Sequence, residues 1–148
     1  MNKTFLTEFA SRMRFKKWIG LADVQRLQRD ILPDGIGCRD QVEVLVALDR
    51  AVACADPAWS AFVVAALVEF VVWAERPTGM VKADTARWLA AALAGDGASP
   101  TMTARLIARE IIEEAQVLED DALNALAATL AWPEPWPKSD LAAASLAA

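Results

Sequence analysis

The sequence predicts an all-α protein, a compact bundle of six or seven helices. Hydrophobic residues make up 55% of the 148 residues, and Ala, Leu and Val dominate over the Thr, Tyr and Ile typical of sheets. Apolar side chains recur at helical spacing in successive segments that Gly and Pro residues separate. One stretch near the middle, Pro57 to Glu75, is apolar almost throughout. A chain of this length favours a single globular core.

We expect the first half of the chain to form three helices before that stretch. Residues 3 to 19 place Phe5, Leu6, Phe9 and Met13 on one stripe, with the basic residues largely off it. Leu21 to Leu32 continues the helical spacing and ends at the turn Pro33-Asp34-Gly35. A third helix is predicted from about Arg39 to Ala53.

The stretch from Pro57 to Glu75 is the predicted central helix. Asp56 is a suitable N-cap, and Pro57 suits the first turn. Between Trp59 and Trp73 the only polar side chains are Ser60 and Glu69, which fall on opposite sides of a helix, so we expect no solvated face. About 17 residues with a carboxylate in mid-span is short for a membrane helix. We therefore expect a buried helix at the centre of the bundle.

Three more helices are predicted after the turn at Pro77 and Gly79. They cover about Lys82 to Ala94, a segment reaching about Val117 with Ser99 as N-cap and Pro100 in its first turn, and Asp121 to Ala131. The last helix follows acidic residues, which are favourable at a helix N-terminus. The segment from Trp132 to Pro137 alternates Trp, Pro and Glu and is not expected to form regular structure.

A weak internal repeat relates the two halves. A shift of 62 residues places Leu27, Ile31 and Asp34-Gly35 on Leu89, Leu93 and Asp96-Gly97, although Leu48 then meets Glu110. The pattern predicts two helix–DG-loop–helix units around the central helix.

Charge is unevenly distributed along the chain. The net charge is −5, but residues 1–20 carry a local excess of +4 and the remainder stands at −9. We divide the chain into a basic amphipathic N-terminal segment (1–20), a helical domain (21–131) and a Trp/Pro-rich tail (132–148). An acidic body makes nucleic acid an improbable partner. The N-terminus lacks the continuous apolar core of a secretory signal, so we expect a cytoplasmic protein.

Residue types that carry catalysis and metal binding are scarce. The chain has no His and no Tyr, so the usual general bases and catalytic triads are absent. If the DG-loops were EF-hands, position 12 would be Gln41 or Thr103 in place of the bidentate Glu that calcium requires. Cys38 and Cys54 are expected to be small buried thiols in reduced form. We expect no enzyme activity, no cofactor and no metal.

Glu69 is the residue that fits its predicted surroundings least. Apolar positions surround it on the helical wheel, so it is expected to be a buried acid. Such a carboxylate must be paired, hydrogen-bonded or protonated. The pattern is compatible with a structural ion pair to Arg76 or Arg87, with a group at the rim of the core, and with a functional acid in a groove.

The candidate partner-binding residues lie at the two chain ends. They are Phe5, Phe9, Trp132 and Trp136, because chain ends become ordered only by docking. The N-terminal segment either packs on the body or docks on an acidic partner or an anionic membrane surface. The Trp residues either clamp the tail onto the bundle or wait for a partner.

The stretch from Asp34-Gly35 to Asp96-Gly97 resembles a family of uncharacterised α-proteobacterial helical proteins. The residues that carry this resemblance are Asp56-Pro57 with Trp59, Pro77 with Gly79, Trp88-Leu89 and the two DG-loops. The paired helices around DG-loops are also similar to TerB-like tellurite-resistance domains. That similarity implies cation binding at Asp34 and Asp96 in a metal-stress response, although no acidic cluster accompanies either residue.

The function expected from the sequence is that of a non-catalytic helical interaction module with a protein partner. The alternative is an acidic cation-binding module of TerB-like type. Neither the partner nor the oligomeric state follows from the residues.

Overall fold

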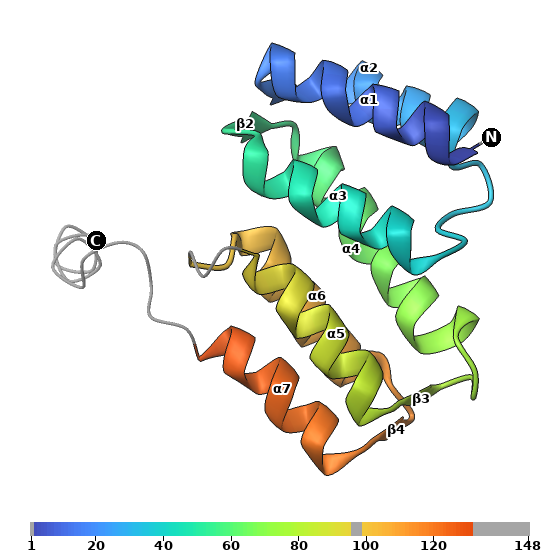
Figure 1. Ribbon diagram of the computed structural model, residues 1–148, viewed down its shortest axis with the longest axis vertical. Helices are drawn as coiled ribbons and strands as arrows, with labels where there is room; N and C mark the ends of the chain where they lie inside the picture. The colour runs from blue at the N-terminus through green and yellow to red at the C-terminus, as the bar shows by residue number, and fades with distance from the viewer. Residues whose placement is uncertain (1, 96–98, 132–148) are drawn as a thin grey trace, which may run out of the picture.

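In the part of the chain that the structure describes, seven α-helices follow one another, and four strands of two residues pair in parallel to form two small sheets. The computed structural model describes residues 2–95 and 99–131. In chain order the described elements are α1 (Asn2–Lys16), β1 (Trp18–Ile19), α2 (Leu21–Arg26), the π-helical η1 (Leu27–Ile31), α3 (Arg39–Ala51), β2 (Cys54–Ala55), α4 (Pro57–Val68), the π-helical η2 (Glu69–Ala74), β3 (Met80–Val81), α5 (Ala83–Ala94), α6 (Met102–Glu114), β4 (Val117–Leu118) and α7 (Asp120–Leu130). Helices α1 and α2 lie at one end of the molecule and α7 at the other, with α3 to α6 between them (Figure 1). The predicted all-α class is confirmed.

A continuous core of buried apolar side chains includes residues from all seven helices. Helix α1 contributes Leu6, Phe9, Ala10 and Met13 to it, so the N-terminal segment packs on the body. Trp59 of α4 is the bulkiest side chain of the core and is only 1% exposed. Burial of such apolar area is the main favourable term in folding.

The two short sheets reveal the internal repeat. Strand β1 pairs in parallel with β2, and β3 pairs in parallel with β4. Strands β1 and β3 are 62 residues apart in the sequence, whereas β2 and β4 are 63 apart. The chain therefore contains two helix–strand–helix–loop–helix–strand–helix units of almost equal period.

Buried positions follow the same two spacings. At a spacing of 62 both partners are buried in these pairs: Val24 and Ala86, Leu27 and Leu89, Ile31 and Leu93, Val42 and Ala104, Leu45 and Ile107, and Val46 and Ala108. At a spacing of 63 the buried pairs are Leu48 and Ile111, Trp59 and Ala122, and Val63 and Leu126. The second unit thus has one extra residue between Leu93 and Ile111, while α3 and α6 both contain 13 residues. This insertion explains why Leu48 meets Glu110 at a uniform spacing of 62: its counterpart is Ile111.

The central helix belongs to both units. The range of α1 (Asn2–Lys16), moved by 62 residues, covers 64–78 and overlaps the second half of α4 and all of η2. The range of α4 (Pro57–Val68), moved by 63 residues, coincides with α7 (Asp120–Leu130) within one residue. Helix α4 is therefore the last helix of the first unit, and its continuation is the first helix of the second.

Capping side chains fix where α4 and α6 begin. The Asp56 carboxylate accepts a hydrogen bond of 2.9 Å from the Ala58 N–H, and Pro57 occupies the first turn, as predicted. The predicted Ser99 cap is wrong, because Thr101 caps α6 by accepting a 3.0 Å hydrogen bond from the Ala104 N–H. Pro100 therefore precedes the helix and is buried beside its start.

The central helix is less buried than its composition predicts. Pro57, Ala61, Ala65 and Glu69, spaced by four residues, are all exposed, so the expectation that it has no solvated face is wrong. Most of these residues are small and apolar, and apolar atoms are common on protein surfaces. The stretch Pro57–Ala74 is long and apolar enough to cross a membrane by length and composition, with a mean hydropathy of 1.8 and a third of its residues buried. Core helices of non-membrane proteins pass the same test, so this property does not by itself place the helix in a bilayer.

Candidate functional site

A groove of about 600 Å³ runs between the central helix and α6. We call it the α4–α6 groove. One wall is formed by α4 and η2 through Pro57, Ser60, Ala61, Val64, Ala65, Val68, Glu69 and Trp73, and the other by α6 through Leu106, Glu110 and Glu114. The spacing of three, four and seven residues on α4 and of four on α6 places these side chains along one face of each helix. The groove therefore follows the helix axes over several turns.

The α4 side of the groove is apolar and built from small residues. Ala61 and Ala65 are exposed, and Val64 and Val68 beside them are half-buried. Small side chains allow the backbone of another helix to approach closely, and half-buried valines leave apolar area for it to cover. This side of the groove can therefore accept an apolar side of a ligand.

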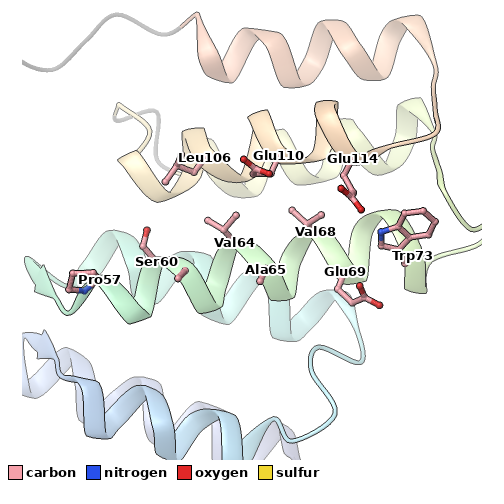
Figure 2. A pocket seen from close by; sticks show the side chains of 11 residues that line it. Pro57, Ser60, Val64, Ala65, Val68, Glu69, Trp73, Leu106, Glu110 and Glu114 are labelled. Carbon is pink, nitrogen blue, oxygen red and sulfur yellow. The ribbon is translucent and has the colours of Figure 1, made fainter.

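Carboxylates stand along the edges of the groove. Glu69 and Glu114 are exposed and Glu110 is half-buried. Figure 2 shows Glu114 projecting from α6 into the space between the two helices, toward Val68 and Trp73. None of the three carboxylates has a hydrogen-bond or ion-pair partner within residues 2–95 and 99–131. Since no Lys or Arg lines the groove, these acids give it a negative potential.

Hydrogen bonds beneath the groove fix α4 against α6. The Ser60 and Thr103 hydroxyl oxygens lie 2.7 Å apart. Behind them, the indole N–H of Trp59 donates to Asp49 Oδ1 at 3.0 Å, and the Thr101 hydroxyl donates to Asp49 Oδ2 at 2.6 Å. Asp49 on α3 thus connects the buried Trp59 with the residue that caps α6. The two walls are held in place before any ligand binds, which lowers the entropic cost of binding.

A second groove lies on the other side of Ala61 and Ala65. Its volume is about 540 Å³, and it separates α4 from η1 and the Pro33-Asp34-Gly35 turn. Five of its lining residues have repeat counterparts that line a smaller cavity of about 280 Å³ between α5 and α7. These pairs are Gln28 and Ala90, Leu32 and Ala94, Phe62 and Ala125, Ala65 and Ala128, and Ala66 and Thr129. This second groove is therefore a feature of the repeated fold, whereas the α4–α6 groove crosses from one unit to the other.

The structure separates the predicted partner-binding residues. Phe5 is 51% exposed, but Phe9 is 3% exposed, so the prediction that Phe9 contacts a partner is wrong. Phe9 faces the core because it continues the buried stripe of Leu6 and Met13 on α1. Trp132 and Trp136 lie outside the described residues.

Two further predictions about burial are wrong. Glu69 is exposed and pairs with neither Arg76 nor Arg87, because it lies at the end of the exposed row of Pro57, Ala61 and Ala65. Cys38 and Cys54 are free thiols, but both are exposed. Cys54 lies in the short strand β2, at the edge of the fold.

No metal centre is present in the described part of the chain. Asp34 is exposed in its turn, and Asp96 lies outside the described residues. Across residues 2–95 and 99–131, no three side chains of His, Cys, Asp or Glu are grouped so that they could hold a metal ion. The three groove carboxylates are therefore spread along the walls and do not form a ligand cluster.

Sequence reasoning identified the helices that form the groove but missed its walls. The spacing of Leu106, Glu110 and Glu114 marks one face of α6, yet such a row usually means a solvated face. Leu106, Glu110 and Glu114 form a wall of the groove only because α6 lies opposite the small residues of α4.

The comparisons with known proteins found no match: no protein-family model, no curated protein and no solved structure is significantly similar to this chain.

Proposed function

We propose that this protein is a non-catalytic interaction module that binds an amphipathic helix of a partner protein in the α4–α6 groove. The observation that carries this proposal is the exposed apolar α4 side of the groove, which no other described residue covers. An amphipathic helix binding in a groove places its apolar stripe on such a surface. Residues Ala61 and Ala65 then become the closest points of approach.

The groove carboxylates define the charge of the partner. Glu110 and Glu114 are one helical turn apart on α6, and Glu69 lies on the opposite wall. A partner helix with Lys or Arg at both edges of its apolar stripe would place opposite charges beside them. Such pairs contribute mainly to specificity and association rate. A nucleic acid would be repelled by the same carboxylates.

The test uses two synthetic amphipathic peptides with the same apolar stripe. One carries Lys and the other Glu at the positions flanking the stripe. We expect the Lys peptide to bind, to shift the methyl NMR signals of Val64 and Val68, and to protect the protein against thermal unfolding. We expect the Glu peptide to bind at least about ten-fold more weakly, because each unfavourable charge contact lowers the affinity.

Matched variants on α6 locate the binding site. Glu110→Lys and Glu114→Lys should each weaken binding of the Lys peptide several-fold and strengthen binding of the Glu peptide. Glu113→Lys is the control, because Glu113 lies on the same helix but outside the groove, where its carboxylate pairs with Arg109 at 3.2 Å. Equal effects of Glu110→Lys and Glu113→Lys, or equal binding of the two peptides, would contradict the proposal.

A crosslinking experiment then identifies the natural partner. A photoreactive amino acid replaces the exposed Ala61, where a larger side chain can be accommodated without disturbing the core. Crosslinks that disappear when Glu110 and Glu114 are both replaced by Lys identify a ligand of the groove. Crosslinks that persist belong to another surface.

A further inference from the structure

An exposed cluster of aromatic and basic side chains surrounds the connection between α1 and α2. We call this cluster the basic-aromatic tip and define it by Phe15, Trp18 and Leu21 with the cations Arg14, Lys16 and Lys17. Phe15 is 91% exposed, and Trp18 and Leu21 are 50% exposed. We infer that the basic-aromatic tip docks on the surface of an anionic lipid bilayer.

The second unit shows that the fold does not need these side chains. At a spacing of 62, the counterparts of Phe15, Trp18 and Leu21 are Pro77, Met80 and Ala83. The same connection between a helix, a strand and a helix is thus made in the second unit without an exposed aromatic residue. The three large side chains are an addition of the first unit, and at least half of the surface of each faces solvent.

Lys17 is the strongest sign that the tip serves a purpose other than folding. Its φ angle is +67°, which makes it the single non-glycine residue with positive φ in the described chain. Its repeat counterpart, Gly79, has a φ angle of +80°. Glycine adopts this conformation readily, whereas a side chain makes it costly. The first unit therefore keeps a cation where the backbone favours glycine.

The charge of the tip is complementary to an anionic surface. Residues 11–22 contain the four cations Arg12, Arg14, Lys16 and Lys17 and no acid. Two acids close to the tip are engaged: Asp23 accepts a 2.6 Å hydrogen bond from Lys16 Nζ, and Asp56, whose N–H donates to the Ile19 carbonyl, caps α4. Burial alone would raise the pKa of Asp23, but hydrogen bonds from Lys16 and the Gly20 N–H and the charges of Lys16 and Arg26 lower it overall. Asp23 is therefore ionised at neutral pH and offsets only part of the positive charge.

Contacts with Lys16 and Gly20 fix the position of the Trp18 ring. Lys16 Nζ lies 4.0 Å from the centroid of the Trp18 ring, a cation–π contact. The ring also covers Gly20 so closely that a Cβ atom there would come within 2.5 Å of it. Tryptophan with a cation beside it is typical of the bilayer interface, where the ring enters the headgroup layer and the charge meets lipid phosphates.

A bilayer fits this surface better than an acidic protein does. An acidic protein partner would need a concave site for the protruding Phe15, which has almost no contact with its own chain. A bilayer accepts protruding apolar side chains without a preformed pocket. The α4–α6 groove carries the opposite charge, so the two surfaces are suited to different ligands.

The experiment measures co-sedimentation of the full chain with vesicles of phosphatidylcholine alone and with one third phosphatidylserine. We expect binding to the anionic vesicles only, with an affinity that falls steeply between about 50 and 300 mM salt. Phe15→Ser should weaken binding about ten-fold, and Lys17→Gly about five-fold, the loss expected for one cation near the surface. Leu123→Ser is the matched control, because Leu123 is an exposed apolar residue of α7 far from the tip in sequence.

Lys17→Gly separates binding from folding. Because glycine relieves the positive φ angle, this variant should unfold at the same temperature as the wild type or higher while binding vesicles less. Binding to neutral and anionic vesicles alike, no binding to either, or equal loss in Phe15→Ser and Leu123→Ser would overturn the inference. Binding to poly-glutamate that matches vesicle binding and does not change in Phe15→Ser would assign the tip to an acidic protein and would also overturn it.

Discussion

Arg39 and Glu75 form a bidentate ion pair that joins the start of α3 to the end of the central helix. Arg39 Nε lies 2.8 Å from Glu75 Oε1, and Arg39 Nη2 lies 3.1 Å from Glu75 Oε2. The same guanidinium donates to Thr85 on α5 at 3.2 Å and stacks on Trp88, with 4.6 Å between Cζ and the ring centroid. The hydrogen bond to Glu75 raises the pKa of Arg39, so this residue stays charged. One side chain thus connects both units.

Arg39→Lys should therefore lower the stability of the protein, although it keeps the positive charge. Lysine cannot make the bidentate contact and stacks less well on Trp88. Because the Arg39 side chain is 39% exposed, we expect a loss of only about 1 kcal/mol of unfolding free energy, and slightly more for Arg39→Ala. Urea denaturation measures this difference. Arg29→Lys, at an exposed pair with Asp30, is the control and should change stability by less than about 0.5 kcal/mol.

Asp49→Ala should destabilise the protein more strongly. Removing the carboxylate leaves the indole N–H of the buried Trp59 without its acceptor and frees the Thr101 hydroxyl. An unsatisfied buried donor costs about 1–3 kcal/mol. Trp59→Phe should cost less stability in the Asp49→Ala background than in the wild type, because the hydrogen bond is already absent there and the cavity is the same in both. Equal costs in the two backgrounds would show that the hydrogen bond is not the cause.

Val71→Asp and Val64→Asp should differ sharply. The apolar composition of the central helix predicts that both would abolish cooperative unfolding. Val71 is fully buried, so an aspartate there would bring an unpaired charge into the core. Val64 is half-buried at the wall of the groove, where a carboxylate can reach water. Thermal melts should show no cooperative transition for Val71→Asp and a cooperative but lower transition for Val64→Asp.

Asp23→Asn should give a pH-dependent loss of stability. The pKa of Asp23 is lower in the folded protein than in the unfolded chain, so its contribution is fully present above the unfolded-state value of about 3.9. That contribution disappears as the pH falls through the lower, folded-state pKa. The wild type should therefore be more stable than Asp23→Asn at pH 6 to 7, by about 1 kcal/mol as for the loss of a cap, and the difference should shrink as the pH falls below the unfolded-state value. A difference that stays constant across the acid range would show that the charge of Asp23 is not responsible.

Added cations should leave the thermal transition unchanged. A ligand that binds only the folded state raises the melting temperature. We expect superimposable melts with Ca²⁺, Mg²⁺, Zn²⁺ and a chelator. A metal-dependent rise that is lost in Asp34→Asn or Asp96→Asn would support the cation-binding alternative instead.

The helices and their order could be predicted from the sequence because most of them carry an apolar stripe, and Gly or Pro marks several of their ends, as at Gly20, Pro57 and Gly95. The exposure of the central helix could not be predicted. Alanine is compatible with the core and with the surface, so the pattern of Ala61 and Ala65 does not show which neighbours cover them.

Other misses have different physical reasons. Strands of two residues have no periodicity to detect, so β1 to β4 were beyond sequence reasoning. The one-residue insertion in the second unit changes the repeat spacing from 62 to 63, so no single shift of the sequence aligns both units throughout. Glu69 looked buried on a helical wheel because a wheel shows the neighbours on one helix and not the gap beside it.

The overlap of the two units in the central helix has a consequence for how the protein unfolds. Since residues of α4 and η2 complete the first unit and begin the second, neither unit has a full set of helices without the other. Unfolding one half would remove a packing partner from the other half. Intermediates with one half intact are therefore high in free energy. The duplicated chain should behave as one cooperative foldon, with the slowest-exchanging amide protons in the central helix rather than at the middle of either half.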